Sequence, residues 1–210
     1  MPTDVLSASD VAHVLTRSAQ ELRGAASELD SLDAAVGDGD HGSSVATLFE
    51  TAVAKTNLEE QSAGHLLNEF GQSLLRHCSG ASGTLYAVLF TNLGSTLEPD
   101  DAIGLSALAR GFRRGLDMVQ KAGGATPGDA TMVDALDPFV DVLEEQARDN
   151  ATLSVALERA ADAAKTGAVS TSQMVARVGR ARGFGDRTRG HEDPGARSFA
   201  VIANAWRTSS

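Results

Sequence analysis

Apolar residues recur with helical spacing through almost the whole chain, and this periodicity constrains the fold more than any other feature. Val11, Val14 and Leu15, for example, stand three and four positions apart, as on one face of an amphipathic helix. Similar runs cover residues 10–22, 45–53, 62–78, 82–92, 103–119, 132–143, 153–165, 174–178 and 199–206. No stretch alternates apolar and polar residues as a half-buried strand would. The pattern predicts an all-α bundle of about eight helices, the first of them capped by Ser9 or Asp10.

The length of the chain agrees with one domain. Its 210 residues lie near the soft prior of about 150 residues per domain, and they can bury a core without disulfides. Residues 1–210 contain no linker and no internal repeat, so we predict a single domain over this whole range. Aromatic residues make up only 4% of the chain, so we expect a closely packed core of small residues.

Charge is unevenly distributed along the sequence. The formal net charge is −10 and the pI is about 4.9, which argues against binding to nucleic acid or to an anionic membrane. Acidic residues nevertheless crowd one stretch and basic residues another. The first holds Asp30, Asp33, Asp38 and Asp40, and the second holds Arg177, Arg180, Arg182, Arg187, Arg189 and Arg197. This separation predicts a site that handles a cation and an anion together.

Cysteine content and hydropathy bear on the compartment. The one cysteine, Cys78, cannot form an internal disulfide, which fits a reducing environment. The first residues lack the basic and apolar regions of a signal peptide, and no apolar run approaches the ~20 residues of a membrane span. We therefore expect a cytoplasmic protein without a membrane segment.

The most informative segment is residues 32–42, LDAAVGDGDHG. Its carboxylates at Asp33, Asp38 and Asp40 are interleaved with glycines that let the backbone fold tightly. Like charges this close repel one another unless a cation lies between them, and oxygen ligands of this kind suit Mg²⁺. The plain alternative is a solvated turn, because Asp and Gly are common turn residues.

Two other interpretations of this segment fail. Gly37, Gly39 and Gly42 have the spacing of a dinucleotide-binding fingerprint, but no strand pattern precedes them and the nearby carboxylates would repel a pyrophosphate. A calcium-binding loop starting at Asp38 would need Gly and Glu where Ser43 and Phe49 stand.

Three further glycine-bearing loops precede helical segments. They cover residues 79–84 (SGASGT), 123–132 (GGATPGDATM) and 185–196 (GDRTRGHEDPGA). Small residues in such places expose the first amides of a helix to a phosphate. Each loop also has a plain explanation: close helix packing for the first, a helix cap from Asp129 or Thr131 for the second, and solvated arginines for the third. Together with the acidic segment, the loops favour a nucleotide phosphate site for phosphoryl transfer, although no Walker A or protein-kinase signature is present.

The order of these motifs resembles that of a known family. The segments are 33–42 (DAAVGDGDHG), 80–83 (GASG), 128–132 (GDATM) and 190–196 (GHEDPGA), and together they are highly specific. They are similar to the nucleotide-binding subunits of dihydroxyacetone kinases, over essentially the whole chain. The resemblance implies an all-α barrel of eight antiparallel helices with ADP or ATP bound in the loops at one end.

The resemblance also implies roles for individual residues. Asp33, Asp38 and Asp40 would hold two Mg²⁺ ions that bridge the phosphates. The nucleotide would be lined by His41, Gly42, Ser43, Ser44, Ala81, Ser82, Gly123 and Met132, with Asp193 and Gly195 in the segment that helps to close the site. Arg187 would face the phosphates and stabilise charge on the transferring group, and His41 would orient a carboxylate or the phosphates.

Partners follow from the same resemblance. In the family a separate subunit holds dihydroxyacetone covalently on a histidine, so this chain would be one half of a split kinase, and a homodimer is expected. The bound nucleotide would be recharged by a phosphocarrier protein of the phosphoenolpyruvate-dependent phosphotransferase system, or ATP would exchange freely. Ala130 stands where the family commonly has a basic residue, which leaves the substrate and partner open. The alternative from another class is a non-catalytic nucleotide-binding module that interacts with a transcription regulator.

Overall fold

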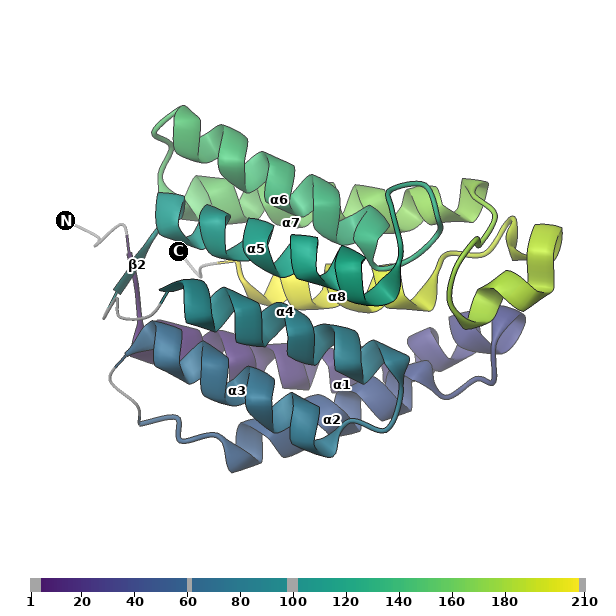
Figure 1. Cartoon of the computed structure of the whole chain (residues 1–210), viewed down its shortest axis with the longest axis horizontal. Helices are drawn as coiled ribbons and strands as arrows, with labels where there is room; N and C mark the ends of the chain where they lie inside the picture. Colours follow the sequence, from purple (N-terminus) through teal and green to yellow (C-terminus); the bar gives the residue numbers. More distant parts are fainter. Residues whose placement is uncertain (1–4, 60–61, 98–101, 208–210) are drawn as a thin grey trace.

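The computed structural model describes residues 5–59, 62–97 and 102–207. Most of this chain is helical, as the periodicity predicted (Figure 1). The α-helices are α1 (Ala8–Val36), α2 (His41–Lys55), α3 (Ala63–His77), α4 (Ala81–Leu97), α5 (Leu105–Gly123), α6 (Val133–Arg148), α7 (Leu153–Ser170) and α8 (Pro194–Ala205). Two 3-10 segments, η1 (Thr171–Gln173) and η2 (Arg180–Thr188), lie between α7 and α8.

The helices form a closed ring. Each helix packs against the next one in the chain, and α8 returns to pack against α1. Because most connections are short, neighbouring helices run in opposite directions. The all-α antiparallel barrel expected from the sequence is confirmed.

Aromatic side chains fill the inside of this ring in two edge-to-face groups. One joins α2, α3 and α4, and the other joins α5, α6 and α8. The first contains Phe49, Phe70, Tyr86 and Phe90, and the second contains Phe112, Phe139, Phe199 and Trp206. Many alanines are buried around them, as expected, but the few aromatic residues occupy the centre of the core.

The structure differs from the sequence-based expectation in three local features. The first helix is capped by Ser7, whose hydroxyl accepts a hydrogen bond from the Asp10 amide while the Asp10 carboxylate accepts from the Ser7 amide. Strand β1 (Val5–Ser7) precedes this helix and pairs antiparallel with β2 (Ala102–Gly104), a sheet too short to show as alternation. Helix α1 also continues to Val36, so Asp33 lies in its last turn and not in a loop.

Residues 174–178 do not form the predicted helix. Their backbone amides have tertiary partners: that of Ala176 donates to the hydroxyl of Thr188 at 3.0 Å, and that of Arg177 donates to the carbonyl of Asp129 at 3.2 Å. These bonds replace the local bonds that a helix would make. They tie the segment before η2 to η2 itself and to the α5–α6 connection.

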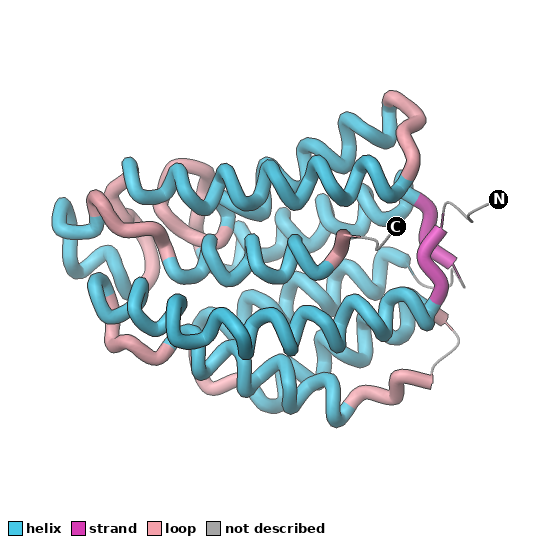
Figure 2. Tube along the Cα trace, turned by 180° about the vertical axis from the view of Figure 1, so that it is seen from behind, coloured by secondary structure: helices cyan, strands magenta, loops and turns pink. Residues whose placement is uncertain are grey.

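The alternating directions of the helices gather four connections at one end of the barrel. These are the segments 37–40, 78–80, 124–132 and 171–193, and they contain the loops singled out in the sequence. The small sheet lies at the opposite end (Figure 2). As a result, α2, α4, α6 and α8 all begin at the first end, where their N-terminal amides carry partial positive charge. None of the described helices has the length and apolar character needed to cross a membrane.

Candidate functional site

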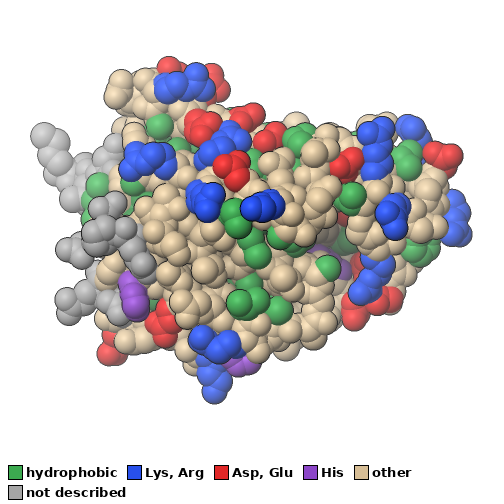
Figure 3. Space-filling model, in the orientation of Figure 1, with side chains coloured by type: hydrophobic (Ala, Val, Ile, Leu, Met, Phe, Trp, Pro, Cys, Tyr) green, Lys and Arg blue, Asp and Glu red, His purple; other side chains and the backbone are tan. Residues whose placement is uncertain are grey.

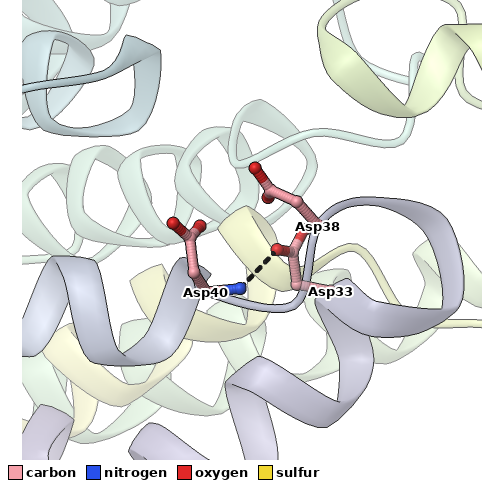
Figure 4. A group of neighbouring side chains, drawn as sticks. All are labelled: Asp33, Asp38 and Asp40. Atoms are coloured by element: carbon pink, nitrogen blue, oxygen red, sulfur yellow. Dashed lines mark hydrogen bonds between the residues drawn. The ribbon is translucent and has the colours of Figure 1, made fainter.

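Three carboxylates converge where α1 passes into α2. Asp33 comes from the last turn of α1, Asp38 from the connection, and Asp40 from the residue that precedes α2 (Figure 4). One oxygen of each lies within 4.8 Å of the others. Asp33 is buried, whereas Asp38 and Asp40 are exposed.

Asp33 organises this junction. Its Oδ2 accepts hydrogen bonds from the amides of Gly39 at 2.8 Å, Asp40 at 3.1 Å and His41 at 3.4 Å, so a side chain of α1 caps the start of α2. Oδ1 of Asp33 takes no part in these bonds. A side chain at position 37 would overlap this oxygen, which explains the glycine there.

A second aspartate of α1 caps the same helix. The carboxylate of Asp30 accepts from the amide of Ser43 at 2.9 Å and from its hydroxyl at 2.5 Å. The Ser43 hydroxyl is therefore engaged with α1. Gly42 also faces α1, because a side chain there would overlap the carbonyl oxygen of Ala26. Gly42 thus permits the close approach of α1 and α2.

The donor set of the junction fits a divalent cation. After the capping bonds, it offers Oδ1 of Asp33 and the exposed carboxylates of Asp38 and Asp40, and the latter makes no capping bond to α2. Carboxylate oxygens are the ligands that Mg²⁺ prefers, and a cation would offset their mutual repulsion. The three aspartates are the residues that could hold Mg²⁺.

A guanidinium group reaches the acidic cluster from η2. Arg180 forms an ion pair with Asp38, although both side chains are more than half exposed. Desolvation acts to raise the pKa of Asp38, but the hydrogen bond and charge of Arg180 outweigh it and the net shift is downward. Arg187, which the sequence analysis preferred, instead lies with its guanidinium carbon 5.1 Å from the centre of the Phe184 ring.

A cavity of about 730 Å³ opens beside the acidic cluster and is lined from all four connections at this end. It is large enough for a ligand of nucleotide size. Of the residues expected at the nucleotide or metal, its lining contains Asp33, Asp38, Asp40, His41, Ser43, Ser44, Ala81, Ser82, Met132, Asp193 and Gly195. Gly42, Gly123 and Arg187 are not in this lining.

His41 is buried in the wall of this cavity. Its Nε2 lies 2.9 Å from the hydroxyl of Ser198, and its Nδ1 lies 3.5 Å from the hydroxyl of Ser82. Burial lowers the pKa of His41 and outweighs the opposing effect of the neighbouring carboxylates of Asp33 and Asp30. Burial in the wall of the cavity thus favours the neutral form of this imidazole.

Asp193 begins α8 at the cavity. Its Oδ1 accepts from the amide of Ala196 at 2.7 Å, and its own amide donates to the hydroxyl of Thr171 at 2.8 Å. Burial raises the pKa of Asp193 to about 7, with the charge of Asp134 acting in the same direction. This carboxyl group is therefore poised to change protonation near neutral pH.

The α5–α6 connection is shaped by two further aspartates. Asp129 Oδ2 accepts from the amide and hydroxyl of Thr126, and Asp134 accepts from the amides of Gly128 and Thr131. These bonds hold Ala130 at a φ of 55°, in the left-handed region, against the cavity. The sequence suggested that Asp129 could cap the following helix. Its carboxylate instead accepts hydrogen bonds from Thr126, within the loop.

Several lining residues were not identified from the sequence. Arg180 belonged to the predicted arginine-rich stretch, but the sequence held no reason to choose it among six arginines. Tyr86 is fully buried in α4, where it follows the helical period like a core residue, and Thr47 is an exposed polar residue of α2. In Figure 3, basic (blue) and acidic (red) side chains lie close together at the right end of the surface. The acidic cluster and the arginine-rich stretch meet through the ion pair of Arg180 with Asp38.

Comparisons with known proteins match most of the chain. The DAK2 domain profile matches residues 35–208. The chain is 36% identical over 198 residues to the ADP-binding subunit DhaL of the PEP-dependent dihydroxyacetone kinase of Escherichia coli, covering 94% of each chain. It is 35% identical to a D-erythrulose kinase of Mycolicibacterium smegmatis, covering 92% of this chain and 34% of that one. The structure of the dihydroxyacetone kinase from C. freundii in complex with AMP-PNP and Mg²⁺ matches with a TM-score of 0.71 and 30% identity, over 93% of this chain and 33% of that chain.

Proposed function

The chain belongs to the DAK2 domain family, and on this premise we propose that it is the nucleotide-binding subunit of a split ketose kinase. It binds ADP or ATP with two Mg²⁺ ions. It then transfers a phosphoryl group to dihydroxyacetone, or to a related ketose, held on a separate sugar-binding subunit. The observation that carries the proposal is the convergence of three aspartates beside a cavity at which four helices begin.

The extent of the matches supports the split arrangement. The separate ADP-binding subunit is matched over 94% of its length, whereas the D-erythrulose kinase is matched over 34% of its length. On this likeness to a separate ADP-binding subunit we propose that the sugar is held by a second chain.

Within this function the aspartates would act as the metal ligands. Asp33 would contribute Oδ1, because its Oδ2 is occupied by three amides, and Asp38 and Asp40 would contribute their exposed carboxylates. Bound Mg²⁺ supplies positive charge that offsets the charge of the phosphates. The protein contributes mainly position and charge, as phosphoryl transfer requires.

The remaining residues would hold the phosphates. Helix α4 begins at the cavity, where the positive end of its dipole favours an anion. The first amides of α2 and α8 are instead bonded to the carboxylates of Asp33, Asp30 and Asp193. Arg180 already contacts the acidic cluster and would move from Asp38 toward the phosphates when metal is bound. Arg187 lies in the same segment and is our candidate for stabilising the transferring group.

Reconstitution tests the proposal. The purified chain is mixed with a dihydroxyacetone-binding kinase subunit and with dihydroxyacetone or erythrulose, and sugar phosphate is measured. One arm supplies ATP, and another supplies phosphoenolpyruvate with the phosphocarrier proteins. We expect turnover in one arm, and loss of that turnover in Asp38→Asn but not in Asp117→Asn, an exposed carboxylate on α5.

The two arms distinguish the phosphoryl donors. Turnover only in the arm with phosphoenolpyruvate and the phosphocarrier proteins means that the bound nucleotide is recharged. Turnover only in the arm with ATP means that the nucleotide exchanges. Nucleotide binding with no turnover in either arm would contradict the kinase assignment and favour the non-catalytic binding module.

A further inference from the structure

A buried chain of hydrogen bonds connects His41 to the interior of the barrel. Ser198, on α8, is fully buried, and its hydroxyl lies 2.9 Å from Nε2 of His41 and 2.7 Å from the hydroxyl of Tyr86, on α4. The same hydroxyl donates to the carbonyl of Gly195 at 3.0 Å. Three helices, α2, α4 and α8, thus meet at one serine oxygen.

The positions of the protons in these hydrogen bonds follow from the number of hydrogen-bond donors. Ser198 has a single hydroxyl proton, and the carbonyl of Gly195 can only accept, so that proton points to Gly195. The serine oxygen is then an acceptor toward its two other partners. Tyr86 must donate its hydroxyl proton to Ser198, and His41 must donate from Nε2. Within these three contacts, any other assignment places two lone pairs against each other in a buried site, which costs free energy. The backbone carbonyl of Pro194 is a further acceptor for the imidazole.

The opposite edge of the imidazole faces the cavity. With the proton on Nε2, Nδ1 of the neutral ring carries a lone pair and can only accept a hydrogen bond. Its neighbour is the hydroxyl of Ser82, in the first turn of α4, at 3.5 Å. Both His41 and Ser82 line the cavity. This long separation leaves room for the contact to tighten when a ligand binds.

We propose that Ser198 is a positioning residue that locks His41 as the Nε2–H tautomer, so that His41 offers the cavity an acceptor at Nδ1. Such an acceptor suits a hydroxyl donor, either that of Ser82 or a water molecule bound to a metal ion. It repels a phosphate oxygen. His41 therefore positions the hydroxyl or water molecule that surrounds the phosphates, and does not itself donate a hydrogen bond to a phosphate oxygen.

The tautomer of His41 is a property of the free protein and can be measured without nucleotide. Only the role of His41 around the phosphates rests on the proposed function. Nuclear magnetic resonance of ¹⁵N-histidine-labelled protein without nucleotide reports which ring nitrogen carries the proton. The chain has five histidines, and His41→Gln identifies the signals of His41 by their loss. We expect a protonated Nε2 and a bare Nδ1 for His41. A bare Nε2, or protons on both nitrogens at pH 7.5, would overturn the inference.

Two variants separate positioning from general support of the fold. Tyr86→Phe removes one donor to Ser198 but leaves the bond to His41, so His41 is expected to keep its tautomer. Ser198→Ala removes the hydroxyl that accepts from Nε2 and leaves the backbone carbonyl of Pro194 in place. His41 is then expected to populate both tautomers, with Mg-ADP affinity reduced roughly fivefold, the factor of a single hydrogen bond. An unchanged His41 spectrum in folded Ser198→Ala would overturn the proposal.

The wild-type spectrum decides the tautomer even where Ser198→Ala does not fold. Failure of the proposed function has a different signature, since wild-type protein would then bind no Mg-ADP in calorimetry whatever the tautomer of His41. The two claims can therefore fail separately.

Discussion

Asp33 caps a helix to which it does not belong: its Oδ2 accepts the amide of Gly39 at 2.8 Å, across the junction between α1 and α2. The amides of Asp40 and His41 point at the same oxygen. Asp33 is therefore both a structural cap and a candidate metal ligand, whereas Asp38 and Asp40 are exposed and have no such structural role.

This difference predicts distinct effects of removing each carboxylate. Asp33→Ala leaves three amides without an acceptor and is expected to lower the free energy of unfolding by about 1–3 kcal/mol. Asp38→Ala is expected to leave this free energy nearly unchanged, because the side chain is exposed. Urea denaturation without metal measures both, and Asp33→Asn, which keeps an accepting oxygen, should lose less than Asp33→Ala. Equal losses for Asp33→Ala and Asp38→Ala would contradict the capping role.

Much of this site could be predicted because its parts are close in sequence. Asp33, Asp38 and Asp40 fall within eight positions, so any compact turn brings them together, and helical periodicity places the glycine loops between helices. The contact of Arg180 could not be predicted, because it depends on how residues 174–188 cross the barrel end. Their amides bond to distant partners such as Asp129, which no local pattern indicates.

The chain of His41, Ser198 and Tyr86 could not be predicted for a related reason. Its members lie on three helices and are far apart in the sequence. Ser198 and Tyr86 occupy core positions of their helices, where the helical period alone indicates packing. Only the closed ring, in which α8 returns to α1, brings them to one point.

Arg180 and the metal are expected to compete for Asp38. Arg180→Ala removes the ion pair, so affinity for Mg²⁺ without nucleotide should rise by about two- to fivefold, the size of an exposed ion pair. Affinity for Mg-ADP should fall, because a cation near the phosphates is lost. Calorimetry of each ligand measures both effects. Arg187→Ala is the control for the change in Mg²⁺ affinity, because the guanidinium of Arg187 lies over the Phe184 ring. A rise in Mg²⁺ affinity in Arg187→Ala would contradict the claim that Arg180 competes with the metal.

Asp193 is expected to make stability depend on pH. Burial raises its pKa to about 7 from an ordinary value of 3.8, so the folded chain binds its proton more tightly than the unfolded chain. The stability from this group is complete below its ordinary pKa and is lost as the pH rises through about 7. Asp193→Asn keeps a good helix cap without titrating, and should flatten this decline in metal-free urea denaturation between pH 5 and pH 8. A decline as steep as that of the wild type would show that Asp193 is not its source.

Glycine at position 42 is expected to be required for packing. Gly42→Ala places a methyl group against the carbonyl of Ala26 and should lower the free energy of unfolding by about 1–3 kcal/mol. Gly24→Ala, in the exposed middle of α1 with no atom within 4 Å of the new carbon, should instead raise it by about 0.5–1 kcal/mol. Thermal or urea unfolding compares the two. Changes of the same sign in the free energy of unfolding would contradict the claim that position 42, unlike position 24, has no room for a side chain.

The central claim is that the three aspartates bind nucleotide through Mg²⁺, and calorimetric titration of ADP into the metal-free chain, with and without added Mg²⁺, tests it most directly. The account predicts tight binding that requires Mg²⁺, is lost in Asp38→Ala and is retained in the exposed control Asp117→Asn. Binding of ADP that is equally strong without Mg²⁺, or unchanged in Asp38→Ala, would contradict it.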